Sequence, residues 1–168
     1  PPEAVAPAKE IPEGECGEAH EPETHLIPNV IRAALEPSLG PVRLFGNDYD
    51  TEDGTCVRDY IHVGDLCDAH LRALEFLDGN PGHHVFNLGT GHGHSVAQVL
   101  AACRAECEGR PDAIYEARRA GDPPTLVAGN ALAAERLQWS PGASLEDCVS
   151  SALAWHRRHM ESQASEPI

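Results

Sequence analysis

The stretch HVFNLGTGHGHSVAQVLAACRAE, residues 84–106, decides the class of fold. It begins with a compact apolar run, HVFNLG, that predicts a strand, and a glycine-rich turn follows. Beyond the turn, Val99, Leu100 and Cys103 recur at helical spacing, and Ser95 stands where a helix is expected to begin. A strand, a tight glycine turn and a helix in this order are typical of α/β proteins.

The same alternation of helices and strands continues on both sides of this stretch. Apolar spacing predicts helices over residues 24–36, 65–77, 95–108, 131–137 and 144–160. Short strands are predicted over residues 41–46, 56–63, 84–89, 112–117 and 125–130. The expected fold class is therefore α/β.

Polar residues stand at the expected start of three further helices. Asp65 and Asn130 are expected to cap the helices that follow them, because their side-chain oxygens accept hydrogen bonds from free backbone N–H groups. Ser144 and Asp147 have the spacing of a capping box. In the first helix, proline in the first turn is tolerated, and Pro37 ends the helix.

The two ends of the chain are expected to carry little regular structure. Residues 1–23 place proline and glycine among glutamate and alanine with no apolar period, which predicts an extended or disordered lead-in. Residues 24–160 hold the predicted folded region, and residues 161–168 are expected to form a frayed tail. The first residue is proline, so the chain is expected to be processed or a fragment.

Composition narrows the function. The chain of 168 residues carries 12 basic and 27 acidic side chains, a net charge of −15, so a basic surface for nucleic acid is not expected. No apolar stretch approaches the roughly 20 residues of a membrane span. Six cysteines without a CxxC pair predict reduced, partly buried thiols in a cytoplasmic protein. Neither nucleic acid nor membrane is therefore an expected partner.

The histidines do not predict a metal site. The chain holds ten of them, and the closest groupings are His92 with His94, Cys67 with His70, and His156 with His159. None of these pairs supplies the three or four ligands of a zinc centre. Surface histidines and hydrogen-bonded core histidines are the expectation.

The glycine-rich turn GTGHGHS does not match a dinucleotide-binding fingerprint. That fingerprint needs a third glycine for close packing of helix on strand. Counted from Gly89, the third glycine position is His94, and counted from Gly91 it is Val96. Glu116, the candidate for a ribose-binding acid, lies 27 residues past Gly89. The turn therefore predicts tight local structure, and no cofactor-binding residue is assigned, although a backbone of this kind is able to approach a ligand.

Three arginines are candidates for gripping a small anion. Arg58 lies in a predicted strand, and Arg118 and Arg119 precede Gly121 and Asp122. A guanidinium binds phosphate through two hydrogen bonds, and in a chain of charge −15 anion binding requires such local groups. The alternative is that each arginine forms a surface ion pair with one of the 27 carboxylates.

No catalytic residue is predicted. Ser95 and Ser144 are better explained as helix caps than as nucleophiles. The only lysine, Lys9, precedes every tyrosine, so the chain contains no Tyr-x-x-x-Lys pair. Acidic residues are numerous, but no pair of them stands out.

Several motifs together resemble one family. They are HLIP, LFGNDYDTEDGTCVRDYIHVGDLCDAHLRALEFL, VFNLGTGHGHSV, RRAGDP and LQWSP, in this order. From about Glu13 to His159 the chain resembles the C-terminal half of the UDP-glucose 4-epimerase family, which belongs to the extended short-chain dehydrogenase/reductases. The DGTCVRDYIHV run is specific to epimerase-like members, whereas NLGTG and RAGDP are shared with other nucleotide-sugar enzymes.

The resemblance implies a Rossmann-type domain that carries NAD and a smaller C-terminal region that closes over a UDP-sugar. Members of the family oxidise C4 of the sugar and return hydride to the other face, which interconverts UDP-glucose and UDP-galactose in galactose metabolism. Within this chain the resemblance implies seven substrate-binding residues: Leu26, Phe45, Arg58, Tyr60, Val96, Arg119 and Asp122.

The resemblance gives these residues different roles. It implies that Arg58 and Arg119 lie near the diphosphate and that Asp122 holds a ribose hydroxyl. It places Leu26 and Phe45 near the uracil, and the remaining two residues on substrate-lining positions.

The chain also departs from the pattern of the family. The NAD fingerprint and the Tyr-x-x-x-Lys pair are absent, so NAD is implied by the family while the half that binds it is missing. His25 stands where relatives carry asparagine. The expectation is a UDP-sugar-binding half, inactive alone, with a separate NAD-binding half or a second copy as its partner. The alternatives are a catalytically silent nucleotide-sugar-binding module, or a fragment of a UDP-arabinose 4-epimerase or UDP-sugar dehydratase.

Overall fold

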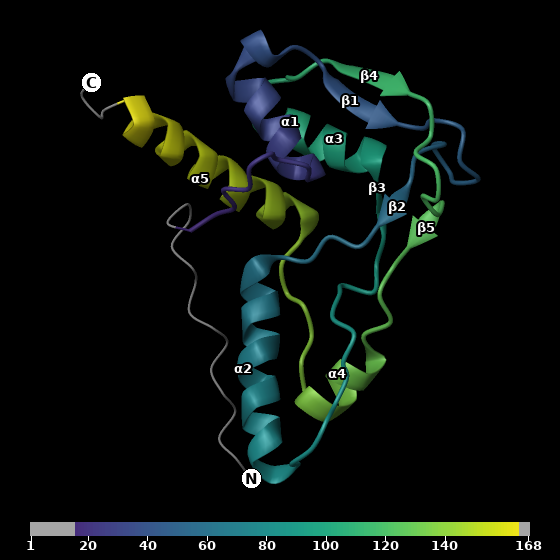
Figure 1. Ribbon diagram of the computed structural model, residues 1–168, viewed down its shortest axis with the longest axis vertical. Helices are drawn as coiled ribbons and strands as arrows, with labels where there is room; N and C mark the ends of the chain where they lie inside the picture. The colour runs from purple at the N-terminus through teal and green to yellow at the C-terminus, as the bar shows by residue number, and fades with distance from the viewer. Residues whose placement is uncertain (1–15, 165–168) are drawn as a thin grey trace.

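The computed structural model describes residues 16–164. Of the lead-in predicted over residues 1–23, the first 15 residues lie outside the described part, and the remainder contains no helix or strand. Of the tail predicted over residues 161–168, the first four residues continue the last helix, and the others lie outside the described part. The elements form a larger and a smaller group, which several chain segments connect (Figure 1).

Three helices and two strands make up the larger group. They are α1 (Leu26–Leu35), α3 (Val96–Glu106), α5 (Leu145–Ala164), β1 (Val42–Phe45) and β4 (Ala113–Glu116). The two strands pair in parallel, with Val42 opposite Ala113 and Phe45 opposite Glu116. Helices α1 and α3 lie between this strand pair and α5 (Figure 1).

A second sheet of three short strands borders the larger group. Its strands are β2 (Val57–Arg58), β3 (His94–Ser95) and β5 (Thr125–Leu126). The order is β3-β2-β5, with β3 antiparallel and β5 parallel to β2. Parallel strands whose connections run through helices are the α/β pattern, so the predicted fold class is confirmed.

The smaller group consists mainly of α2 (Val63–Gly79) and α4 (Ala131–Leu137), while the short 3-10 helix η1 (Pro37–Leu39) joins α1 to β1. Trp139 is only 1% exposed and packs with Ala69 of α2 and Leu137 of α4. Its indole N–H donates to the backbone oxygen of Asp65 at 3.0 Å. The segment that follows α4 is thereby fastened to the start of α2.

The main hydrophobic core lies among α1, β1, α3 and α5. Val30, Leu44, Val99 and Val149 supply one side chain from each element, and none is more than 1% exposed. Burying a side chain of this size is worth roughly 1.5–3 kcal/mol relative to leaving it in water. The core therefore holds the three helices against the β1–β4 pair, which fixes the position of the strand ends.

Two helix starts form as the sequence predicts. At α3, Ser95 Oγ accepts the N–H of Gln98 at 3.1 Å, and the Gln98 side chain accepts the N–H of Ser95 at 2.9 Å. At α5, Ser144 Oγ accepts the N–H of Asp147 at 3.1 Å, and Asp147 Oδ2 accepts the N–H of Ser144 at 2.8 Å. Both are complete capping boxes.

The predicted cap at Asp65 is wrong, and Asn130 stands at the predicted cap position without a capping hydrogen bond from its side chain. Helix α2 starts two residues earlier than expected, and its capping residue is His62, whose Nδ1 accepts a backbone N–H at 3.0 Å. Asp65 instead accepts the backbone N–H of Gly142 at 3.0 Å. Asn130 occupies the cap position of α4, but its side chain donates to the backbone oxygen of Gly89 at 2.8 Å. Both side chains hold distant segments, which a local pattern does not reveal.

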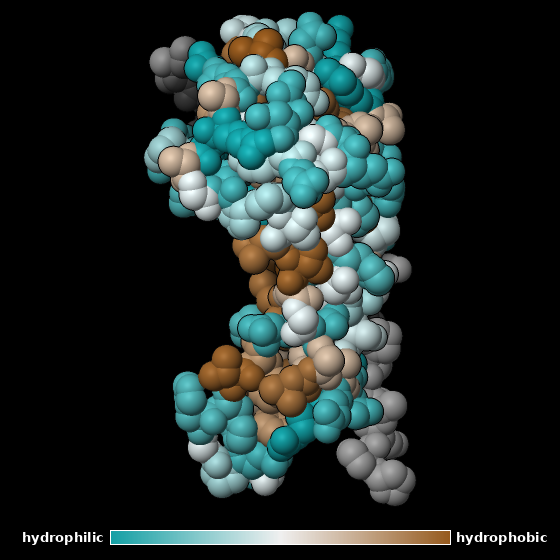
Figure 2. Space-filling view, turned by 90° about the vertical axis from the view of Figure 1, so that its right-hand side faces the viewer, coloured by the Kyte–Doolittle hydropathy of each residue, from teal (hydrophilic) through white to brown (hydrophobic). Residues whose placement is uncertain are grey.

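The strand predicted over residues 84–89 is also wrong. A strand exists only through hydrogen bonds to a neighbour, and none of the residues between 16 and 164 pairs with this segment. Val85 is 66% exposed, whereas Phe86 and Leu88 pack partly against the cluster around Trp139. Figure 2 shows apolar side chains gathered over the middle and lower parts of one side of the molecule. The segment is thus an apolar run without a partner strand.

All six cysteines are free, and three of them are buried: Cys56, Cys103 and Cys107. The sequence led us to expect reduced thiols of which some are buried. Burial raises the pKa of the Cys103 thiol to about 12, so this thiol stays protonated at neutral pH. Among the helices of the described part, none has the length and apolar character needed to cross a bilayer.

Candidate substrate-binding site

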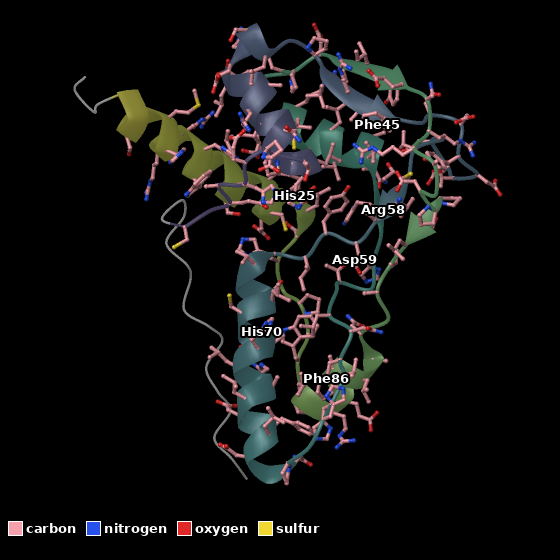
Figure 3. All side chains as sticks on the ribbon, in the orientation of Figure 1. His25, Phe45, Arg58, Asp59, His70 and Phe86 are labelled. Atoms are coloured by element: carbon pink, nitrogen blue, oxygen red, sulfur yellow. The ribbon has the colours of Figure 1, made fainter. Side chains whose placement is uncertain are left out.

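A cavity of about 830 Å³ lies beside the first turn of α1 and the ends of β1 and β2. All seven residues predicted to bind substrate line this cavity: Leu26, Phe45, Arg58, Tyr60, Val96, Arg119 and Asp122. They come from α1, β1, β2, α3 and the loop before β5, so the fold brings together residues that are distant in the sequence. The labelled side chains His25, Phe45 and Arg58 can be followed in Figure 3.

Arg58 reaches the cavity from the end of β2. Its Nη1 donates to the backbone oxygen of Val57 at 2.8 Å, and its Nη2 lies 3.6 Å from Oδ1 of Asp122. Its side chain is 23% exposed, which leaves guanidinium N–H groups accessible from the cavity. A half-buried guanidinium of this kind is suited to grip an anionic oxygen, and the Asp122 carboxylate holds it in place from one side.

Arg119 and Arg118 diverge, although they are adjacent in sequence. The Arg119 guanidinium lies over the ring of Phe45, 4.0 Å from its centroid, and Arg119 lines the cavity. Arg118 instead pairs with Asp48 at 2.6 Å and lies over Tyr49, and it is not among the cavity residues. Of the two arginines that the RRAGDP motif offers, the structure directs the second into the site.

Part of the cavity lining is apolar or uncharged. Leu26 and Val96 stand at the first turns of α1 and α3, and both pack against the main core. Burial raises the pKa of Tyr60 to about 12. Its phenol is therefore protonated at neutral pH and is available as a hydrogen-bond donor. A cavity lined by both guanidinium groups and apolar side chains suits a ligand with an anionic group beside a flat, uncharged ring.

Two further residues at the cavity were not predicted as site residues. Glu23 is 3% exposed at its side chain, and its Oε1 accepts the backbone N–H groups of Thr24 and His25, each at 2.7 Å. Nδ1 of His25 lies 2.9 Å from that oxygen and 3.0 Å from a Glu18 oxygen. Glu23 organises the turn that leads into α1, so its signal in the sequence is an acid just before a helix start. His25 is the partner of both carboxylates, so the grouping of the three side chains does not by itself indicate a bound metal.

The glycine-rich loop owes its glycines to packing. A Cβ at Gly89 would lie 2.6 Å from Oδ2 of Asp59, and a Cβ at Gly93 would lie 2.3 Å from Cγ1 of Val57. Gly91 has a φ of +73°, which side chains disfavour. Close contacts at Gly89 and Gly93 and the positive φ of Gly91 therefore account for these glycines within the chain itself.

Comparison with known proteins shows which enzymes the chain is similar to. Residues 12–89 match the model of the NAD dependent epimerase/dehydratase family. The chain is 49% identical over 147 residues to a UDP-glucose 4-epimerase from Rhizobium leguminosarum bv. trifolii, an alignment that covers 87% of this chain and 44% of that protein. Over most of its length the chain is therefore similar to part of the UDP-glucose 4-epimerases. The family model that it matches in part describes NAD-dependent enzymes.

Solved structures of UDP-glucose 4-epimerases have the same fold. An enzyme from Stenotrophomonas maltophila with bound NAD and formylated UDP-arabinopyranose superposes with a TM-score of 0.81 at 36% identity, over 86% of this chain and 43% of that one. An enzyme from Bifidobacterium longum in complex with NAD+ and UDP superposes with a TM-score of 0.76 at 37% identity, over 81% and 40%. The chain spans less than half the length of the epimerases it matches.

Proposed function

We propose that this chain supplies the UDP-sugar-binding part of a UDP-glucose 4-epimerase. One observation carries the proposal: the two arginines implied to bind the diphosphate, Arg58 and Arg119, line the same cavity as the five other residues implied to bind substrate. If the two arginines only formed surface ion pairs, nothing would require them to face one cavity from separate segments. Their convergence therefore supports a binding role without using the resemblance.

In this proposal the residues of the chain bind and orient the substrate. Arg58 and Arg119 hold the diphosphate from two sides, and the carboxylate of Asp122 accepts a hydrogen bond from a ribose hydroxyl. Leu26 and Phe45 offer apolar surface to the uracil ring. NAD would supply the hydride chemistry. The chain lacks the third glycine of an NAD fingerprint and a Tyr-x-x-x-Lys pair, so it is expected to need an NAD-binding part with which to act.

The surface of the smaller group supports a role for such a partner. Val85, on the segment without a partner strand, is 66% exposed, and Leu71 and Leu74 on α2 are 54% and 63% exposed. Large apolar side chains exposed to this extent are unfavourable in water and are typical of surfaces that another polypeptide covers. We expect an NAD-binding half to cover them, while a second copy of this chain is the alternative partner.

The sugar itself has more than one candidate. The protein MoeE5, 30% identical to this chain, was solved in complex with UDP-glucuronic acid and NAD, and the Stenotrophomonas maltophila structure holds a formylated UDP-arabinopyranose. UDP-glucose and UDP-galactose remain our proposed pair, with a UDP-arabinose 4-epimerase, a UDP-sugar dehydratase or a silent binding module as alternatives.

Titration calorimetry with UDP, UMP and uridine tests the proposal. We expect UDP to bind more tightly than UMP, and uridine to bind most weakly, because each phosphate adds contacts with the two arginines. Equal affinity for UDP and uridine, or no binding of any of the three, would contradict it.

A further inference from the structure

We propose that Asp59 is a positioning residue for the charged side of the cavity, a role that rests on the proposed function. Asp59 lies between Arg58 and Tyr60, both of which line the cavity, whereas Asp59 does not. Side chains alternate along an extended chain, so the carboxylate of Asp59 is expected on the opposite side of the backbone. Figure 3 shows Asp59 at the junction between the two groups of elements.

The carboxylate of Asp59 accepts four hydrogen bonds from two other segments. Oδ1 accepts the backbone N–H of Thr90 at 2.8 Å and its hydroxyl at 2.7 Å. Oδ2 accepts the backbone N–H groups of Gly91 and Ala128, each at 3.2 Å. One side chain thus ties together the end of β2, the glycine-rich loop and the segment that follows β5.

The backbone around Asp59 is built to admit this carboxylate. Gly89 leaves room for it, since a Cβ there would lie 2.6 Å from Oδ2 of Asp59. Asn130, which follows the segment that donates to Asp59, holds the backbone oxygen of Gly89 at 2.8 Å. Burial raises the pKa of Asp59, but the hydrogen bonds from Thr90 and the other donors lower the pKa by a larger amount. The pKa of Asp59 therefore lies below its usual range. The carboxylate is therefore ionised at neutral pH and remains an acceptor at all four bonds.

These bonds set the position of Arg58. The guanidinium is held by a hydrogen bond to its neighbour Val57 and by a 3.6 Å pair with Asp122, so its reach into the cavity follows the backbone of β2. Asp59 follows Arg58 directly, and its hydrogen bonds hold the backbone at the end of β2 on the side away from the cavity. A displaced guanidinium loses paired hydrogen-bond geometry to a phosphate, for which small misplacements are costly.

The test compares Asp59→Asn and Thr90→Val with the control Asp65→Asn. In Asp59→Asn an amide NH₂ replaces one acceptor oxygen, so two donors lose their partner. Thr90→Val removes a single hydroxyl and is the milder variant. Asp65 also accepts two backbone N–H groups, from Gly142 and Ala143 at 3.0 Å each, but it does not line the cavity. The measurements are UDP affinity by calorimetry at a temperature where each variant is folded, the unfolding temperature, and amide hydrogen exchange of residues 57–61 without ligand.

We expect Asp59→Asn to bind UDP about tenfold more weakly than the wild type, with faster exchange over residues 57–61. Thr90→Val should show a smaller loss in the same direction. Asp65→Asn should leave both UDP affinity and exchange in this segment unchanged, because the two donors to Asp65 share one oxygen, which the amide oxygen of asparagine replaces. Equal affinity of Asp59→Asn and wild type, or an equal loss in Asp65→Asn, would overturn the positioning role. A wild type that binds no UDP would overturn the proposed function instead, and unchanged exchange in Asp59→Asn would then overturn the anchoring by Asp59 separately.

Discussion

The guanidinium of Arg119 lies over the ring of Phe45, 4.0 Å from the ring centroid. The aromatic face attracts the cation and fixes the plane of the guanidinium, while the N–H groups on its edge remain directed sideways. Phe45 is the last residue of β1, so the β1–β4 pair fixes the position of the ring on which the Arg119 guanidinium packs. The cavity thereby receives one arginine from β2 and one held by the end of β1.

Arg58→Ala and Arg119→Ala should each weaken UDP binding by at least about tenfold, because a hydrogen bond to a charged group is worth about 1.5–3 kcal/mol. Arg118→Ala is the matched control, since Arg118 is adjacent to Arg119 but pairs with Asp48 outside the cavity. Calorimetric titration of UDP into the three variants and the wild type gives the comparison.

Lysine at position 58 or 119 should restore only part of the affinity, because an ammonium does not reproduce the two-pronged contact. If Arg118→Ala loses as much affinity as the other two variants, the arginines act through the general surface charge, and the specific site is wrong.

The chain alone should not interconvert UDP-glucose and UDP-galactose when NAD is added. It contains no Tyr-x-x-x-Lys pair, and its glycine-rich loop is occupied by contacts with Asp59 and Val57. A coupled assay for UDP-galactose formation, with a full-length epimerase as the positive control, makes the measurement. Turnover above the blank would show that the chain carries catalytic groups of its own.

Stability should fall at acidic pH through three aspartates. Burial raises the pKa of Asp53 and of Asp59, but in each case hydrogen bonds lower the pKa by a larger amount. Hydrogen bonds from Ser144 lower the pKa of Asp147. A carboxylate with a lowered pKa in the folded state stabilises the fold above its unfolded pKa of about 3.9, and this contribution disappears as the pH falls through the folded pKa. The free energy of unfolding should therefore decline below about pH 4.

Denaturant unfolding between pH 3 and 7 measures that decline, and Asp59→Asn should flatten part of it because the titrating group is gone. A decline of equal steepness in the variant would assign the acid sensitivity to other groups.

The isolated chain should self-associate through the segment around Val85. This residue is 66% exposed on a segment without a partner strand, and an open edge of this kind invites pairing with another chain. Val85→Lys should lower the apparent mass in sedimentation velocity. Ile114→Lys is the control, because Ile114 is 43% exposed on β4 in the other group of elements. A monomeric wild type would contradict this prediction.

Local patterns in the sequence predicted much of the fold. The helix cap at Ser95 and the capping box at Ser144 form as predicted, because every group in them lies within three residues of its partner. The helical spacing of α1, α3 and α5 likewise follows from which side chains each helix buries. The seven cavity residues were predicted from the resemblance of the motifs, and the structure brings all seven together. Their roles in binding remain a prediction.

The errors lie where a residue's partner is far away in the chain. Asp65 looks like a helix cap because its local surroundings allow it, yet its hydrogen-bond donors come from Gly142 and Ala143. The run at residues 84–89 looks like a strand because it is apolar, but strand formation depends on a neighbour that periodicity does not show. Asp59 carries no local signal, since its four hydrogen bonds come from segments more than 30 residues away.

The two tryptophans give each group of elements its own spectroscopic reporter. Trp139 is sealed among α2 and α4, while Trp155 lies on α5 with its ring stacked on His159 at 4.8 Å. A single-tryptophan version, with phenylalanine replacing the other residue, should fluoresce with a blue-shifted emission for Trp139. Melting curves recorded on the two versions will then show whether the smaller group opens before the larger one or together with it.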